Sequence, residues 1–337
     1  LLELVSLPVI FLSIVSSLAG MESNRSVALL GRRVLTYTLA TTVIAALVGL
    51  ALYFLINPAA GLITAPTASA AAFSGTSYTD FLLGMVPSNL VQTFSGQGSV
   101  MAVVFLGLLF GFAILRLEEK ERVLLRDGFS ALFSMMIAVT RFILSFMPVA
   151  VWAFTALFVQ SIYRGEGSFA HVWWYVLTVV LANLVQGFVV LPLFLWLKGL
   201  SPRAIFAAFR PALTLAFISK SSNMTLPVTL ECAQQRAGVA ERVARFCLPL
   251  CATINMNGCA AFILITLLFV ANASGIVLSF SDIFSWLILA TVAAIGNAGV
   301  PMGCFFLTSA FLAYFQLPVE MMGVILPVYA LIDMVET

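Results

Sequence analysis

Three apolar stretches of this sequence carry polar or helix-breaking residues at their centres, at 219–227 (SKSSNMTLP), 255–258 (NMNG) and 296–303 (GNAGVPMG). Ser and Asn favour turns over helix interiors, whereas Gly and Pro interrupt helices directly. A broken helix exposes carbonyl oxygens that suit cations and N–H groups that suit anions. The residue types therefore indicate the binding of a small charged molecule and ions.

Covalent chemistry has little support in the sequence. Asp333, Glu336 and Lys220 are the acid–base groups placed deep in apolar segments, and no nucleophile, base and orienting group accompany one another. The five cysteines are odd in number and show no metal-ligand spacing. We therefore expect neither an enzyme nor a cofactor. A net charge of +2 also argues against a nucleic-acid partner.

Composition places the chain in a lipid bilayer. Hydrophobic residues make up 62% of the chain and charged residues 9%, with a mean hydropathy of +1.12. Soluble domains average roughly a quarter charged residues. A surface this poor in charge needs lipid as its solvent, so the fold class is all-α integral membrane, multi-pass.

Apolar segments long enough to span a bilayer recur along the chain. They lie near 1–20, 33–56, 99–116, 130–159, 172–197, 244–272 and 322–337, while 205–230 and 283–316 are apolar but broken. The chain lacks an initiator Met and its ends fall inside apolar runs, so we expect it to be truncated at both ends.

Basic residues set the predicted orientation. Thirteen Lys and Arg fall in the connections near 21–33, 116–127, 198–210 and 231–245, against one in the alternate connections, which predicts that the first set is cytoplasmic. This count requires 205–230 to be a re-entrant hairpin. With a second hairpin at 283–316 and an unwound span at 255–258, the pattern indicates an inverted repeat around a midplane site. Kinks that serve packing alone are the alternative.

The same stretches resemble the glutamate/dicarboxylate:cation symporter family. Residues 225–229 match its T-L-P-V-T and 298–301 its A-G-V-P, while TINMNGC at 253–259 resembles T-I-N-M-D-G-T and DMVET at 333–337 resembles D-M-G-R-T. The resemblance implies eight spans and two re-entrant hairpins, usually in a trimer. It divides this chain into a scaffold domain at 1–204, with spans two to six, and a transport domain at 205–337.

The resemblance also implies roles for individual residues. Ser221, Ser222, Asn223 and the N–H groups near Val300 would hold the substrate carboxylate, supported by Thr337, and Asp333 would hold the ammonium group. Cys259, Cys304 and Glu336 would face the substrate side chain. The cation ligands implied are backbone carbonyls of Cys251, Thr253, Asn255 and Met256, and a second set formed by Thr41 and Thr42 with Asn255 and Asn257.

Departures from the family pattern bear on the substrate. Glu336 replaces an arginine that clamps acidic side chains. An ionised Glu336 and a second carboxylate about 4 Å apart repel by roughly 4 kcal/mol at an effective dielectric near 20, which is nearly three decades of affinity. A protonated Glu336 would escape this penalty but would still not replace the arginine fork. Thiols at Cys259 and Cys304 would make the pocket less polar, which favours a neutral substrate side chain. Asn257 replaces an aspartate, which should weaken or remove one sodium site, and Tyr329 stands where the family often has another aspartate.

The sequence thus predicts a secondary transporter in the cell membrane that couples Na⁺ or H⁺ to the symport of a neutral or cationic amino acid. Na⁺ is the expected coupling ion and a homotrimer the expected assembly. One alternative is a carrier of glutamate, aspartate or a dicarboxylate, as in most of the family. Another, from a different class, is an ion channel that uses the hairpins as a filter.

Overall fold

The computed structural model describes residues 2–20, 25–61, 87, 89–94, 100–163, 169–297 and 302–337, and these residues form helices and turns without a strand. The helices are α1 (Leu2–Ala19), α2 (Arg25–Ile56), α4 (Leu90–Thr93), α5 (Val100–Ile114), α6 (Glu119–Leu144), α7 (Met147–Tyr163), α8 (Phe169–Val185), α9 (Leu191–Leu197), α10 (Pro202–Ser219), α11 (Ser222–Glu231), α12 (Glu241–Ile254), α13 (Asn257–Ala273), α14 (Phe280–Gly296), α15 (Gly303–Tyr314) and α16 (Met321–Glu336), with π-helical turns η2 (Gln186–Val190) and η3 (Cys232–Arg236).

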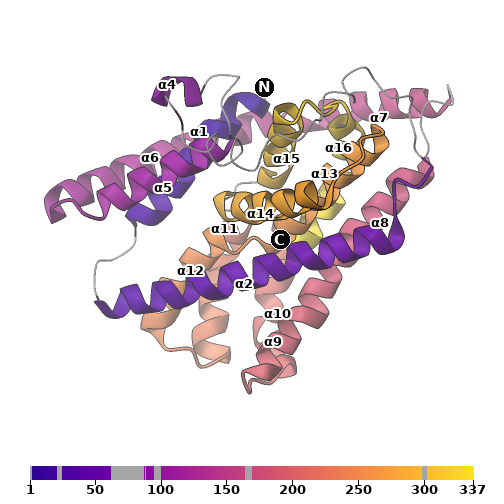
Figure 1. Ribbon diagram of the computed structural model, residues 1–337. Helices are drawn as coiled ribbons and strands as arrows, with labels where there is room; N and C mark the ends of the chain where they lie inside the picture. Colours follow the sequence, from indigo (N-terminus) through magenta and orange to yellow (C-terminus); the bar gives the residue numbers. More distant parts are fainter. Residues whose placement is uncertain are drawn as a thin grey trace.

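Helix α13 is the core of the fold. It is buried along almost its whole length, and α2, α8, α14, α15 and α16 all pack against it. Figure 1 shows the long helix α2 running across the molecule beside this central group. A helix that is apolar on every side is stable only when neighbours surround it.

Polar side chains tie α13 to its neighbours within this apolar core. The Tyr53 hydroxyl of α2 donates to the carbonyl of Leu268 at 3.1 Å and accepts from Asn272 at 2.7 Å. The Tyr175 hydroxyl of α8 pairs with Thr266 at 2.7 Å. Because each group is satisfied, these contacts fix the rotation of α13 without the cost of an unpaired buried donor.

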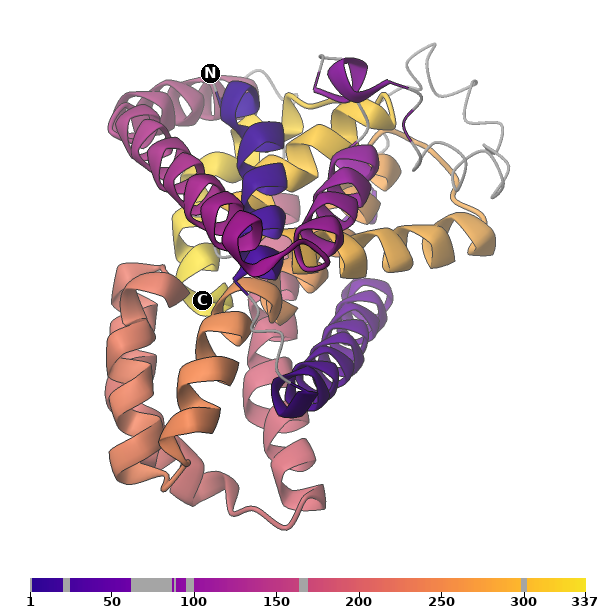
Figure 2. The ribbon, with the colours of Figure 1, turned by 90° about the vertical axis from the view of Figure 1, so that its left-hand side faces the viewer.

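A second group of helices, α1, α5 and α6, packs together at the periphery, and α1 also contacts α15 (Figures 1 and 2). Large apolar side chains remain exposed on the outward faces of several helices. Examples are Phe54, Leu55, Phe142, Trp152, Phe188 and Trp196. Such a surface suits contact with lipid chains.

The break predicted near 219–227 is shorter in the structure than the residue types indicate. Helix α10 ends at Ser219, Lys220 adopts a left-handed conformation with φ 52°, and α11 begins at Ser222 and continues through Pro227. The arms are unequal, since α10 has 18 residues and α11 has 10. Helices α10 and α11 pack against each other, but their re-entry into one side of a bilayer stays a prediction.

The predicted unwound span is confirmed, and the break is confined to two residues. Helix α12 ends at Ile254 and α13 starts at Asn257, with Asn255 and Met256 in non-helical conformations between them. The prediction of one continuous span at 130–159 is wrong, because α6 ends at Leu144 and α7 begins at Met147.

Four helical segments within the described residues are long and apolar enough to cross a membrane: Leu30–Ile56, Glu119–Thr140, Ala170–Leu197 and Glu241–Ala273. The all-helical membrane fold class is therefore confirmed. The division at residue 204 stays a prediction, and the contacts of α2 and α8 with α13 run across it.

We predict that Gly111→Ala destabilises the peripheral helix group. A Cβ at Gly111 would lie 2.7 Å from the Cβ of Leu18, so α1 and α5 would have to separate. Overpacking of this kind costs about 1–3 kcal/mol. Gly128→Ala on α6 is the matched control, since nothing lies within 4 Å of its added Cβ. Thermal unfolding of both variants in detergent measures the difference, and equal midpoints would contradict this packing.

Candidate functional site

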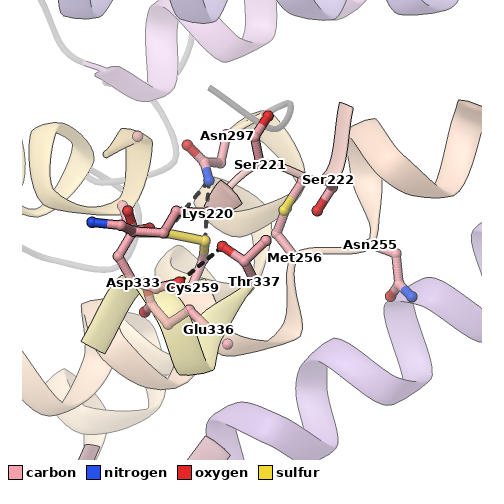
Figure 3. A pocket seen from close by; sticks show the side chains of 13 residues that line it. Lys220, Ser221, Ser222, Asn255, Met256, Cys259, Asn297, Asp333, Glu336 and Thr337 are labelled. Carbon is pink, nitrogen blue, oxygen red and sulfur yellow. Dashed lines mark hydrogen bonds between the residues drawn. A yellow bond between two sulfur atoms is a disulfide. The ribbon is translucent and has the colours of Figure 1, made fainter. Parts of the chain in front are cut away.

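A polar pocket lies where six helices and the helix break of 255–256 meet. Its lining comes from the α10–α11 junction, the start of α13, the end of α14, the start of α15 and the end of α16. The lining residues are Lys220, Ser221, Ser222, Asn255, Met256, Gly258, Cys259, Asn297, Gly303, Cys304, Asp333, Glu336 and Thr337. Figure 3 shows most of these side chains gathered around Cys259 and Glu336.

Three helices begin at this pocket. Ser222 starts α11, Asn257 starts α13 and Gly303 starts α15. The first N–H groups of a helix have no partner within the helix, and the helix dipole adds positive potential there. Three such ends at one pocket favour the binding of an anionic group.

Ser221 caps α11 and faces the same pocket. Its hydroxyl oxygen accepts from the N–H of Met224 at 3.3 Å, which leaves the hydroxyl hydrogen available for donation to a ligand. Lys220, two residues before α11, and Met302, directly before α15, both have positive φ, 52° and 59°. Non-glycine residues rarely adopt this conformation, and it concentrates at functional sites.

The opposite wall of the pocket is acidic. Asp333 and Glu336 both project from α16, and the Thr337 hydroxyl donates to the carbonyl of Asp333 at 2.8 Å. The buried Tyr329 donates its hydroxyl to Oε2 of Glu336 at 3.3 Å. Oε1 of Glu336 is buried without a hydrogen-bond partner among the described residues. This oxygen is therefore an acceptor that a bound ligand could satisfy.

Cys259 and Cys304 form a disulfide that joins α13 to α15, with their Cα atoms 5.4 Å apart. The prediction that two free thiols line the pocket is wrong for this state of the protein. The Asn297 amide donates to both sulfur atoms, at 3.0 and 3.4 Å. Gly303 makes room for Asn297, because a Cβ there would overlap the Asn297 side chain.

A second polar cluster lies beside the break in the span. The hydroxyls of Thr41 and Thr42 donate to Oδ1 of Asn257 at 3.3 and 2.8 Å. Gln186, in the π-helical turn η2, donates to the carbonyl of Thr41 at 3.1 Å. The structure therefore joins Thr41, Thr42 and Asn257, as the sequence predicts, but Asn255 is exposed and its amide points away from Cys259 and Glu336 (Figure 3).

Other predicted site residues divide into three groups. Ser221, Ser222, Cys259, Cys304, Asp333, Glu336, Thr337, Asn255 and Met256 line the pocket. Asn223 is exposed and is not part of the lining, and Val300 lies outside the described residues. The Cys251 carbonyl already accepts the N–H of Asn255 at 2.9 Å, and the Thr253 hydroxyl donates to the Leu250 carbonyl at 2.7 Å. Their role as cation ligands stays a prediction.

Sequence reasoning missed three polar residues beside the site, Asn183, Gln186 and Asn297. A Cβ on Gly258 would lie 2.6 Å from Oδ1 of Asn183 and 3.0 Å from Cα of Glu336, so α8, α13 and α16 meet closely here. The signal was present for all three, because polar side chains inside an apolar span usually face the protein interior and Asn297 belongs to the break at 296–303.

Helices interrupted around a shared polar pocket are characteristic of membrane transport proteins, and this chain belongs to that class. It matches the sequence model of the sodium:dicarboxylate symporter family over residues 1–337, so it is a member of that family. The family consists of transporters, and the chain is therefore not an enzyme.

Similar proteins include amino acid transporters of mammals. The neutral amino acid transporter B(0) of Oryctolagus cuniculus is 28% identical over 369 residues, which cover 99% of this chain and 68% of the relative. The human protein of the same name is also 28% identical, with the same coverage. Excitatory amino acid transporter 3 of Mus musculus is 28% identical over 389 residues, covering 100% of this chain and 74% of that protein.

We predict that Thr42→Val destabilises the protein through Asn257. The change removes the Thr42 hydroxyl, which donates to Oδ1 of Asn257 at 2.8 Å. The buried oxygen then keeps only the 3.3 Å contact with the Thr41 hydroxyl among the described residues. A buried acceptor that loses its partner costs about 1–3 kcal/mol. Thr178→Val is the control, because that buried hydroxyl donates to the carbonyl of Trp174, in its own helix. A thermal unfolding midpoint that falls equally in both variants would contradict a stabilising role of the Thr42–Asn257 hydrogen bond.

Proposed function

We propose that this protein is a cation-coupled symporter of an amino acid whose side chain is neutral or cationic. The observation that carries the proposal is Glu336, which lines the pocket with one buried carboxylate oxygen that has no hydrogen-bond partner among the residues the structure describes. A carboxylate at this place repels a second carboxylate and attracts a donor or a positive charge.

The pocket is polarised in the way that an α-amino acid requires. Helix starts at Ser222, Asn257 and Gly303, with the Ser221 hydroxyl, supply donors for a carboxylate group. Asp333, on the opposite wall, would hold the ammonium group. Lys220 lines the same pocket and offsets part of the negative charge. The remaining space beside Glu336 is then left for the substrate side chain.

The Asn257 cluster bears on cation coupling. A neutral amide oxygen that already accepts from Thr41 and Thr42 offers a cation less than a free carboxylate does. We expect one cation site to be weakened or lost here. Na⁺ at carbonyls near the break of α12 and α13 remains the expected coupling ion, with H⁺ as the alternative.

The proposed oligomeric state rests on membership in the family. We expect a homotrimer in the cell membrane, in which the region from 205 onward carries the substrate past a scaffold. Thr41 and Thr42 of α2 and Gln186 of η2, which continues α8, lie next to the site. We therefore expect α2 and α8 to move together with α13, although both precede residue 205.

Competition of labelled amino acid uptake into liposomes tests the substrate class. We predict that alanine, serine or arginine competes more strongly than aspartate, because Glu336 repels a second carboxylate. A repulsion of roughly 4 kcal/mol corresponds to nearly three decades of affinity. Strong competition by aspartate alone would overturn the substrate class, whereas absence of saturable, cation-dependent uptake would overturn the symporter itself.

Glu336→Arg should move the preference toward acidic substrates, by up to about three decades in the ratio of aspartate to alanine. An arginine fork also supplies two charge-assisted hydrogen bonds to a carboxylate. Glu320→Arg is the matched control, since Glu320 is exposed at the start of the same helix, away from the pocket. Equal selectivity in both variants would place residue 336 outside the substrate contact.

Asn257→Asp should increase the dependence of uptake on Na⁺. The new carboxylate would adjoin the Thr41 and Thr42 hydroxyls and add a full negative charge to the oxygen cluster. We expect the Na⁺ concentration for half-maximal uptake to fall by about tenfold, the equivalent of about 1.4 kcal/mol. Replacement of Na⁺ by choline is the control, and an unchanged Na⁺ response would show that the cluster holds no transported cation.

A further inference from the structure

The disulfide in the pocket has a third chemical neighbour. The sulfur atoms of Cys259 and Cys304 and a carboxylate oxygen of Glu336 all lie within 4.8 Å of one another. The two cysteines are buried. These three residues come from α13, α15 and α16, so the cluster exists only in the folded protein (Figure 3).

Two buried acceptor atoms at this cluster lack hydrogen-bond partners among the described residues. They are Oε1 of Glu336 and Oδ1 of Asn297. The Nδ2 of the same Asn297 lies 3.0 and 3.4 Å from the two sulfur atoms, which places the amide beside the cysteine pair. Unsatisfied buried acceptors cost free energy unless a donor or a cation meets them.

Reduction of the disulfide gives two neutral thiols, and loss of both thiol protons would then change the charge balance of the pocket. Among the described residues, Asp333 and Glu336 are the carboxylates of the lining and Lys220 is its one cation. Ion pairs among the described residues, Arg126–Asp127 and Arg245–Glu241, lie elsewhere on the surface. Two further thiolates would leave the pocket strongly negative, and charges at membrane depth require a partner.

We propose that the reduced pocket is a binding site for a thiophilic divalent cation of the Zn²⁺ or Cd²⁺ type. The sulfur atoms of Cys259 and Cys304 and a carboxylate oxygen of Glu336 are three ligands, and the Asn297 oxygen or water completes a tetrahedron. Zinc takes sulfur at about 2.3 Å and oxygen at about 2.0–2.2 Å. The sulfur atoms must separate after reduction, and a Cα separation of 5.4 Å leaves the two side chains within reach of one ion.

Cation binding at this site depends on the redox state of Cys259 and Cys304. A dithiol or phosphine supplies two electrons and is itself oxidised, while the S–S bond accepts these electrons and two protons to give two thiols. The cation then displaces the two thiol protons to water as it forms two metal–sulfur bonds. In the oxidised protein both sulfurs are committed to each other, so the site is closed to the ion.

Cd²⁺ titration of the purified full-length protein in detergent tests the proposal, followed by the ultraviolet charge-transfer absorption of Cd–thiolate bonds. The protein is reduced with a phosphine, which is then removed. A Cys232→Ser, Cys247→Ser background excludes the i, i+4 pair that Cys247 forms with Cys251. We expect one Cd²⁺ per chain after reduction and none before it. Cys259→Ser and Cys304→Ser should each abolish the absorption band.

Glu336→Gln provides a variant that keeps both thiols and the shape of the side chain. Even groups that only orient a metal ligand change metal affinity by about 10- to 100-fold, so loss of a ligand charge should weaken Cd²⁺ binding by at least about tenfold. Binding unaffected by oxidation, by loss of either cysteine or by Glu336→Gln would overturn the assignment. The measurement needs no uptake, so its failure is separate from a failure of the symporter proposal.

Discussion

The structure depends on one constraint: backbone groups freed by a helix break cannot be left facing lipid. Breaks at Lys220–Ser221 and at Asn255–Met256, and the start of α15 at Gly303, all border the same pocket. Helices α2, α8, α14 and α16 pack against the helices that begin or end at these sites, and Ser221 and Asn257 are buried there, whereas Asn255 stays exposed. The same arrangement collects polar groups in one place, so the requirement of the backbone and the requirement of a binding site are met together.

Helix α13 connects the two polar clusters. Its first residue, Asn257, accepts from α2, while Cys259, two residues later, is joined to α15 and borders Glu336. Because α13 is also held by Tyr53 and Tyr175, it cannot rotate without disturbing both clusters. A change at the Asn257 cluster would therefore reach the pocket through a single rigid helix, which is a physical route for coupling a cation to a substrate.

Sequence reasoning identified the helical membrane class and the residues of the pocket better than it identified contacts between distant segments. Composition and breaker residues predict the helix break at Asn255–Met256, because these signals are local. The disulfide between Cys259 and Cys304 spans 45 residues, and nothing in their spacing indicates it. The turn at 145–146 that divides α6 from α7 was missed although a local signal is present, since Ser145 lies in the turn and Pro148 follows it at the start of α7.

The departures from the family pattern are mutually compatible. The resemblance places aspartates at positions 257 and 329 and an arginine at 336, a sum of −1, whereas Asn257, Tyr329 and Glu336 also sum to −1. The negative charge is therefore relocated, from the cation cluster and the interior of α16 to the substrate end of the pocket. Tyr329 now donates a hydrogen bond to Glu336. This bond helps to keep a carboxylate side chain at position 336, where the family pattern has an arginine. With Glu336 ionised, a pocket altered in this way would keep its total attraction for positive charge and, under the proposed function, would direct that attraction toward the substrate side chain.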